Sequence, residues 1–157
     1  MSDLTFNVAK GRIVELYNNV DNNVPANSAL IIVPVDAGAT SDATIRDFAT
    51  LAAVLAGGVT ERTTGGWSRK TLTDVELGAL AVDNANDWYQ VLLPSPQTWT
   101  AVTAGVVTDL IVCYDGDTTG GTDANIVPLT MHDFAITPDG TDVQAVISGT
   151  TGFFRAT

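Results

Sequence analysis

The stretch that decides the fold runs from residue 109 to residue 156 and contains four apolar segments: DLIVCY at 109–114, IVPLTM at 126–131, DVQAVIS at 142–148 and GFFRA at 152–156. Each segment has roughly the length and composition of a strand. Gly, Asp and Thr predominate between the segments, which predicts turns at 115–124, 137–141 and 149–151. This part of the chain is therefore expected to form a sheet.

Further strands are predicted on the N-terminal side of this stretch. The side chains of Leu4–Val8 alternate between apolar and polar, which is the period of a strand with one buried face. Ala29–Val35 is a continuous apolar run, and Pro34 near its end favours an edge strand or a strand terminus. Weaker strand signals occur at 70–80, 88–93 and 98–102.

One helix is predicted over Ser41–Leu55. Ser41 can cap its first turn, and Gly57 and Gly58 end it. Its apolar side chains recur at steps of three and four residues and form one stripe: Ile45, Phe48, Leu51, Ala52 and Leu55. Residues 12–17 fit one helical turn as well as a buried strand, so that segment stays ambiguous.

The expected fold is mainly β, either a β-sandwich or a jelly-roll-like or β-tulip-like barrel, with one packed α-helix around 41–56. The length of 157 residues suits a single domain over 1–157. Residues 1–10 are a candidate N-terminal arm or exchanged strand, because a short, alternating segment without Pro can extend a neighbour's sheet.

The composition excludes several classes of partner. The chain has 18 acidic and 7 basic residues and a formal charge of −11, so its surface repels phosphate backbones and no nucleic-acid partner is expected. Its longest apolar runs fall far short of the roughly 20 residues that a membrane helix needs, so no membrane partner is expected. The N-terminus lacks the basic and apolar regions of a signal peptide, which favours synthesis in the cytoplasm. The single cysteine, Cys113, lies inside an apolar run and is interpreted as a small core residue.

No residues are predicted to be catalytic or to bind a cofactor. His132, the one histidine, is followed by Asp133, but adjacent residues of a strand point to opposite faces and cooperate poorly as an acid–base pair. The chain also lacks the G-x-S-x-G motif that would place a nucleophilic serine on a strained turn.

The acidic loop at 115–123 is the one place that suggests a metal. Asp115, Asp117 and Asp123 are hard oxygen ligands, but Thr119 and Ile126 stand where an EF-hand has a further oxygen ligand and a Glu. We favour a solvated turn without a metal site, and an irregular calcium site is the alternative.

Six segments spread over the whole chain carry a resemblance to a known family: LTFNVAKGRIVELY at 4–17, DATIRDFATLA at 42–52, RKTL at 69–72, WTA at 99–101, LIVCYD at 110–115 and GFFRA at 152–156. Together they resemble structural proteins of the heads of tailed bacteriophages, of the capsid decoration (cement) type. The resemblance implies a virion protein on the capsid exterior that binds the major capsid protein and stabilises the assembled head. It also implies a homo-oligomer, a trimer at three-fold positions of the shell.

The side chains expected to form contacts in such a role are apolar residues near both ends and one tryptophan: Leu4, Phe6, Trp67, Phe153 and Phe154. A head–tail neck or tail subunit is the first alternative. A carbohydrate-binding jelly-roll module is the second, because Trp88, Tyr89 and Trp99 could stack on sugars. An enzyme ranks last, since no residues combine the types and spacing that a mechanism requires.

Overall fold

A computed structural model describes residues 2–149 and 151–156. It is mainly β, with 32% of the chain in strands and 14% in helices, and its strands form three antiparallel sheets. The mainly β class predicted from the sequence is confirmed. The sandwich or barrel architecture and the single packed helix are not confirmed.

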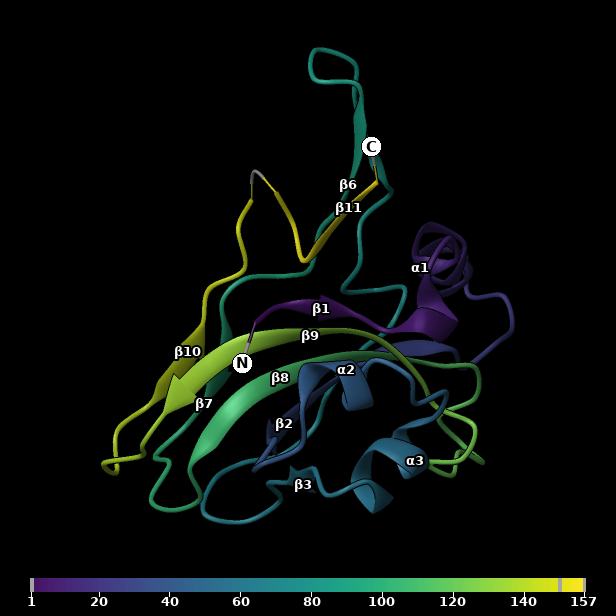
Figure 1. The fold of residues 1–157 in the computed structure, drawn as a ribbon. Helices are drawn as coiled ribbons and strands as arrows, with labels where there is room; N and C mark the ends of the chain where they lie inside the picture. Colours follow the sequence, from purple (N-terminus) through teal and green to yellow (C-terminus); the bar gives the residue numbers. More distant parts are fainter. Residues whose placement is uncertain (1, 150, 157) are drawn as a thin grey trace.

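The largest sheet has six strands and forms the centre of the molecule (Figure 1). Its order is β1-β9-β8-β2-β3, and β4 also pairs with β2. The strands are β1 (Leu4–Thr5), β2 (Ala29–Asp36), β3 (Thr60–Glu61), β4 (Lys70–Leu72), β8 (Val107–Asp115) and β9 (Val127–Ile136). Three of the predicted strands, at 29–35, 109–114 and 126–131, therefore lie side by side in this sheet.

The two longest central pairings join β2 to β8 and β8 to β9. The β2–β8 register runs from Ala29 opposite Asp115 to Val35 opposite Asp109. Nearly every residue of β2 and every residue of β8 except Thr108 is buried, so both faces of these strands are covered. Continuous apolar runs, rather than alternating ones, are the sequence pattern that such doubly covered strands require.

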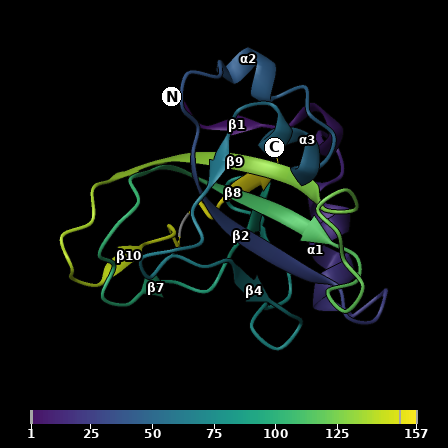
Figure 2. The same ribbon diagram turned by 90° about the horizontal axis from the view of Figure 1, so that it is seen from below.

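Different layers cover the two faces of the main sheet. In Figure 2, the helices α2 (Asp42–Ile45) and α3 (Leu51–Ala56) lie on one side of β1, β9 and β8. The two-stranded sheet of β7 (Gln97–Trp99) and β10 (Val143–Ala145) lies on the other side. On that second side, the Trp99 ring packs against Trp67 at 5.3 Å and against Phe134 of β9 at 6.3 Å between ring centroids.

A third sheet, of order β11-β6-β5, projects from the body of the molecule (Figure 1). Its strands are β5 (Ala81–Asp83), β6 (Trp88–Val91) and β11 (Phe154–Ala156). The turn between β5 and β6 coincides with the DNAND sequence at 83–87, where Asp83 accepts hydrogen bonds from the backbone N–H groups of Ala85 and Asn86. We call this three-stranded sheet the arm.

The helix predicted over 41–55 is two short helices, which corrects the prediction. Ser41 does cap α2, but α3 has its own cap, because the Thr50 hydroxyl accepts a hydrogen bond from the Ala53 N–H. Between them, the carbonyl of Arg46 accepts from the Asn7 N–H, and the Leu51 N–H donates to the carbonyl of Ile126. These contacts with distant segments replace the i→i−4 bonds that would have joined the two helices.

The ambiguous segment at 12–17 belongs to a helix, α1 (Ile13–Asp21). Its buried residues, Ile13, Leu16, Tyr17 and Val20, follow the spacing of one helical face. The strand predicted over 4–8 is shorter than expected: β1 ends at Thr5, and a 3₁₀ turn, η1, occupies Asn7–Ala9. Within the chain β1 pairs with β9, so an exchange of residues 1–10 between subunits stays a prediction.

Pro34 does not mark an edge strand, because β2 has partners on both sides. The carbonyl of Pro34 accepts from the Arg62 N–H, on the side where β3 and β4 pair with β2. The N and C=O groups of one residue point to the same side of a strand, so the missing N–H of Pro34 also faces that side. There it lies opposite the gap between β4, which pairs with residues 30–32, and β3, which pairs with 35 and 36. A proline is tolerated where no neighbour needs its donor.

Replacing Ile111 with Ala should destabilise the protein strongly. Ile111 lies at the centre of β8, opposite Val33 and Met131, and is fully buried. The lost side chain leaves a cavity, which in a protein core costs about 2–5 kcal/mol. Urea unfolding measures the change, with Val75→Ala as the control: Val75 is 84% exposed, and its truncation should cost less than about 0.5 kcal/mol. Equal stabilities of the two variants would contradict the central position of β8.

Candidate functional site

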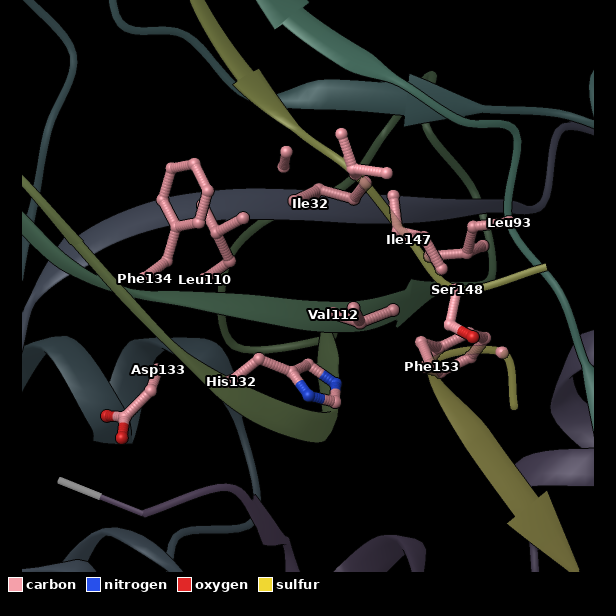
Figure 3. A pocket seen from close by; sticks show the side chains of 13 residues that line it. Ile32, Leu93, Leu110, Val112, His132, Asp133, Phe134, Ile147, Ser148 and Phe153 are labelled. Atoms are coloured by element: carbon pink, nitrogen blue, oxygen red, sulfur yellow. The ribbon is translucent and has the colours of Figure 1, made fainter. Parts of the chain in front are cut away.

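A largely apolar pocket of about 200 Å³ lies between the main sheet and the chain segment that leads from β10 to β11 (Figure 3). The main sheet contributes Leu110 and Val112 of β8 and Phe134 of β9. The facing wall comes from Leu93, Ile147 and Phe153. We call it the apolar pocket.

The strand register explains why these side chains meet. Residues directly opposite each other in a sheet share a face, and residues two apart on one strand do as well. Ile32 lies opposite Val112, and Leu110 lies opposite His132, so one face of three neighbouring strands lines the pocket. Leu93, just after β6, and Phe153, just before β11, close it from the base of the arm.

His132 forms the polar side of the pocket. Its Nε2 lies 2.9 Å from the Thr130 hydroxyl, and its Nδ1 lies 3.4 Å from a carboxylate oxygen of Asp3. The other Asp3 oxygen accepts a hydrogen bond of 2.9 Å from the Asp133 N–H. Figure 3 shows the side chains of His132 and Asp133 pointing in different directions, as expected for neighbours on a strand. Asp3 therefore links the start of β1 to β9 through its carboxylate.

A second cavity, of about 230 Å³, adjoins the first and shares His132 and Phe153 with it. Its other lining residues come from β1 and from the start of β11, including Thr5 and Arg155. The Arg155 guanidinium also lies over the ring of Trp88, 3.9 Å from its centroid. This second cavity is more polar than the apolar pocket, because Asp3, His132 and Arg155 all contribute to it.

Asp109 is a fully buried carboxylate on β8. One of its oxygens accepts a hydrogen bond of 2.6 Å from the Thr108 hydroxyl, and the other has no partner within the part of the chain that the structure describes. Burial raises the pKa of Asp109 above its ordinary value, and the facing charge of Asp133 adds to the rise, while the Thr108 bond opposes it.

The acidic loop uses its carboxylates locally. Asp115 accepts a hydrogen bond from the Asp117 N–H, and Asp117 accepts two from Thr119, which hold the pKa of Asp117 below its ordinary value. Asp123 pairs with Arg69 at 2.7 Å. Across residues 2–149 and 151–156, no three His, Cys, Asp or Glu side chains lie close enough together to hold a metal ion. Calcium binding by this loop stays an untested alternative.

Arg69 joins two acids from different parts of the chain. Its guanidinium contacts Glu61 of β3 at 2.6 Å and Asp123 of the acidic loop at 2.7 Å. The hydrogen bonds to Glu61 are the main reason why the pKa of Arg69 is raised. The next residue in the chain, Lys70, has its ammonium 5.1 Å from the centroid of the Trp99 ring. The two ion pairs of Arg69 join β3 to the acidic loop.

The structure places four of the five expected contact residues in the core of the single chain. Leu4, Phe6, Trp67 and Phe153 are at most 8% exposed, and only Phe154 is half-buried. The Trp67 indole also donates a hydrogen bond of 2.7 Å to the carbonyl of Gly105. Their role in contacts with a partner stays a prediction, but without rearrangement only Phe154 offers a partner more than marginal side-chain surface.

The aromatic residues considered for sugar stacking are not equally accessible. Trp99 is 1% exposed and serves as core, so it has no face for a sugar. Trp88 is half-buried under Arg155, and Tyr89 is 43% exposed. Val146 lines the apolar pocket and is 79% exposed, and it was not among the predicted contact residues. Its place in the apolar segment DVQAVIS had suggested a buried strand instead.

Comparison with known proteins identified no matching family model, curated protein or solved structure. Among the described residues, no helix combines the length and the apolar character that crossing a membrane would require.

Replacing Asp109 with Asn should increase stability more at neutral pH than at pH 4. The raised pKa of Asp109 in the folded protein means that the unfolded chain releases this proton first as the pH rises above about 3.9. The wild type therefore loses stability as the pH rises toward the folded pKa, and the Asn variant lacks this loss. Urea unfolding at several pH values measures the difference.

Asp139→Asn is the control for this experiment. Two hydrogen bonds from Thr141 lower the pKa of Asp139, so the wild-type carboxylate stabilises the fold above its unfolded pKa and this stabilisation is lost as the pH falls. The two variants should thus show opposite trends with pH. A difference between wild type and Asp109→Asn that does not change with pH would show that Asp109 is not perturbed.

Proposed function

We propose that this chain is a virion structural protein that binds the outer surface of an assembled phage head and stabilises it as a decoration protein. The resemblance of its sequence to that class motivates the proposal. The structural observation that supports it most directly is the arm, which carries apolar side chains into solvent. The proposed role is to cover and join the surfaces of neighbouring capsid subunits.

The arm exposes a pair of apolar side chains on one face. Val82 of β5 lies directly opposite Tyr89 of β6, and their exposures are 53% and 43%. Trp88 and Arg155 pack on each other through a cation–π contact. The pairing of β6 with both β5 and β11 gives the arm a backbone ladder that holds Val82 and Tyr89 in place. Exposed apolar residues presented on a rigid element are typical of a binding surface.

The charge of the chain fits a position on the outside of a head. A net charge of −11 keeps a free subunit soluble and disfavours contact with packaged DNA. Several copies that each bury modest apolar area would bind by multivalency. A trimer at three-fold positions is the oligomer that we propose, and the major capsid protein is the proposed partner.

A neck or tail subunit would need the same kind of surface, and its symmetry would distinguish it. A ring of six or twelve copies in an electron cryomicroscopy map of the particle would favour the neck or tail, and clusters of three on the shell would favour decoration. The carbohydrate-binding alternative is weakened because Trp99 is buried.

The protein should co-sediment with purified heads that lack it, and a Val82→Asp, Tyr89→Asp double variant should bind at least tenfold more weakly. In the double variant, two carboxylates would be buried against the partner. The free energy of burying them exceeds the roughly 1.4 kcal/mol that corresponds to a tenfold change in affinity. Val75→Asp is the control, because Val75 is exposed to 84% outside the arm. Circular dichroism checks that all variants fold. If the wild type does not bind heads, the proposal is wrong.

A further inference from the structure

We propose that the apolar pocket is a socket for one large apolar side chain of the partner protein, carried on a segment with basic residues beside it. This inference rests on the proposed function, because it makes the head surface the source of that side chain. It assigns the pocket a role that is separate from the exposed Val82 and Tyr89 of the arm.

The size of the pocket favours a single side chain. Its volume of about 200 Å³ is smaller than the roughly 300–1,000 Å³ of sites for cofactors and drug-sized ligands. A cavity of about 150 Å³ lined by Leu, Ile and Phe is known to hold one benzene molecule. The apolar pocket, lined by the same types of side chain, therefore has room for one aromatic ring or one branched aliphatic group.

Strand pairing and burial fix the sheet side of the pocket. Leu110 and Val112 belong to β8, which pairs on both sides along its length, and neither side chain is more than 7% exposed. Leu93 and Phe153, on the facing wall, are also buried. A preformed, largely apolar socket that the partner closes off from water is the environment in which a single partner side chain contributes most to affinity.

Exposed apolar surface continues from the pocket to its rim. Val146, which lines the pocket, is 79% exposed, although its neighbour Ala145 is buried. A side chain that enters the pocket would bring its backbone across Val146 and bury it. The pocket is also continuous with the arm, because Leu93 follows β6 and Phe153 precedes β11, so a partner that covers one reaches the other.

The charges at the rim select the segment that carries the side chain. The Asp3 carboxylate beside His132 is 67% exposed, whereas the Asp133 side chain points away from His132, to the face of β9 that it shares with Asp109 of β8. Among the described residues, Arg155 is the one Lys or Arg that lines the adjoining cavity, and it stacks on Trp88. A partner segment with Lys or Arg next to the anchoring residue complements Asp3 and the net charge of −11 of the chain, whereas an acidic segment would be repelled.

The first experiment titrates toluene and indole into the ¹⁵N-labelled full chain and follows its amide resonances. Saturable shifts at Leu93, Leu110 and Phe153 are expected in the wild type. They should be lost in Ala145→Leu, which fills the pocket from a buried residue that lines it. Ala135→Leu, on an exposed residue of β9, is the matched control and should bind like the wild type. Absence of saturable binding in the wild type would overturn the proposal.

The second experiment measures binding of the same variants to heads, and adds Val146→Lys and Val146→Asp. We expect Ala145→Leu to bind at least tenfold more weakly, and Val146→Lys to bind more weakly than Val146→Asp because it repels a basic segment. Val75→Lys, exposed elsewhere, should bind like the wild type. The two Val146 variants alter an exposed side chain, so they keep the test valid if Ala145→Leu does not fold.

The outcomes separate this inference from the proposed function. If the wild type binds heads and Ala145→Leu and Val146→Lys bind equally well, the socket is wrong and the decoration role stands. If the wild type binds indole but not heads, the partner is wrong and the pocket is a site for a small apolar molecule. Self-association that Ala145→Leu abolishes would identify a second copy as the occupant and would also overturn the proposal.

Discussion

The burial of both faces of β2 and β8 is the constraint on which the structure depends. These two strands pair over residues 29–35 and 109–115, and their side chains pack into layers on both faces of the sheet. The helices α2 and α3 cover one face, and the other is shared by the Trp67–Trp99–Phe134 cluster and the apolar pocket. The pocket is a gap in the layer that covers this face, and its sheet side is held in place by the pairing of β8 with its neighbours.

The central strands were predictable because their signal is local. ALIIVPV and DLIVCY are apolar without interruption, and such runs are buried on both faces wherever they lie. The helix α1 was also predictable, because extending the segment 12–17 to Val20 completes the apolar face of a helix. The break between α2 and α3 was not predictable, because it depends on hydrogen bonds from Asn7 and to Ile126, which no local pattern reveals. The position of Pro34 in an interior strand was not predictable either, because a proline is tolerated there only since neither β3 nor β4 pairs with residue 34.

The candidate site was harder to predict than the fold. Its walls come from residues 32 to 153, and only the strand register shows that they share a face. Trp67 and Phe153 were expected at a partner surface because aromatic residues favour interfaces. In the structure both side chains are buried within the chain, and the Trp67 indole donates a hydrogen bond to the Gly105 carbonyl. Val146 showed the opposite behaviour: it continues an apolar run and yet faces solvent, since β10 ends at Ala145.

The shared guanidinium of Arg69 has a consequence for how this protein tolerates sequence change. One planar group serves two carboxylates that are 62 positions apart in the chain, Glu61 and Asp123, and so ties the rim strand β3 to the long connection between β8 and β9. A lysine keeps the charge but has a single ammonium without the flat fork that addresses both acids. Arg69→Lys, which substitution tables score as a mild change, would thus release either Glu61 or Asp123 from its ion pair. Substitutions of Arg69 should therefore be rarer among related sequences than its partial exposure suggests.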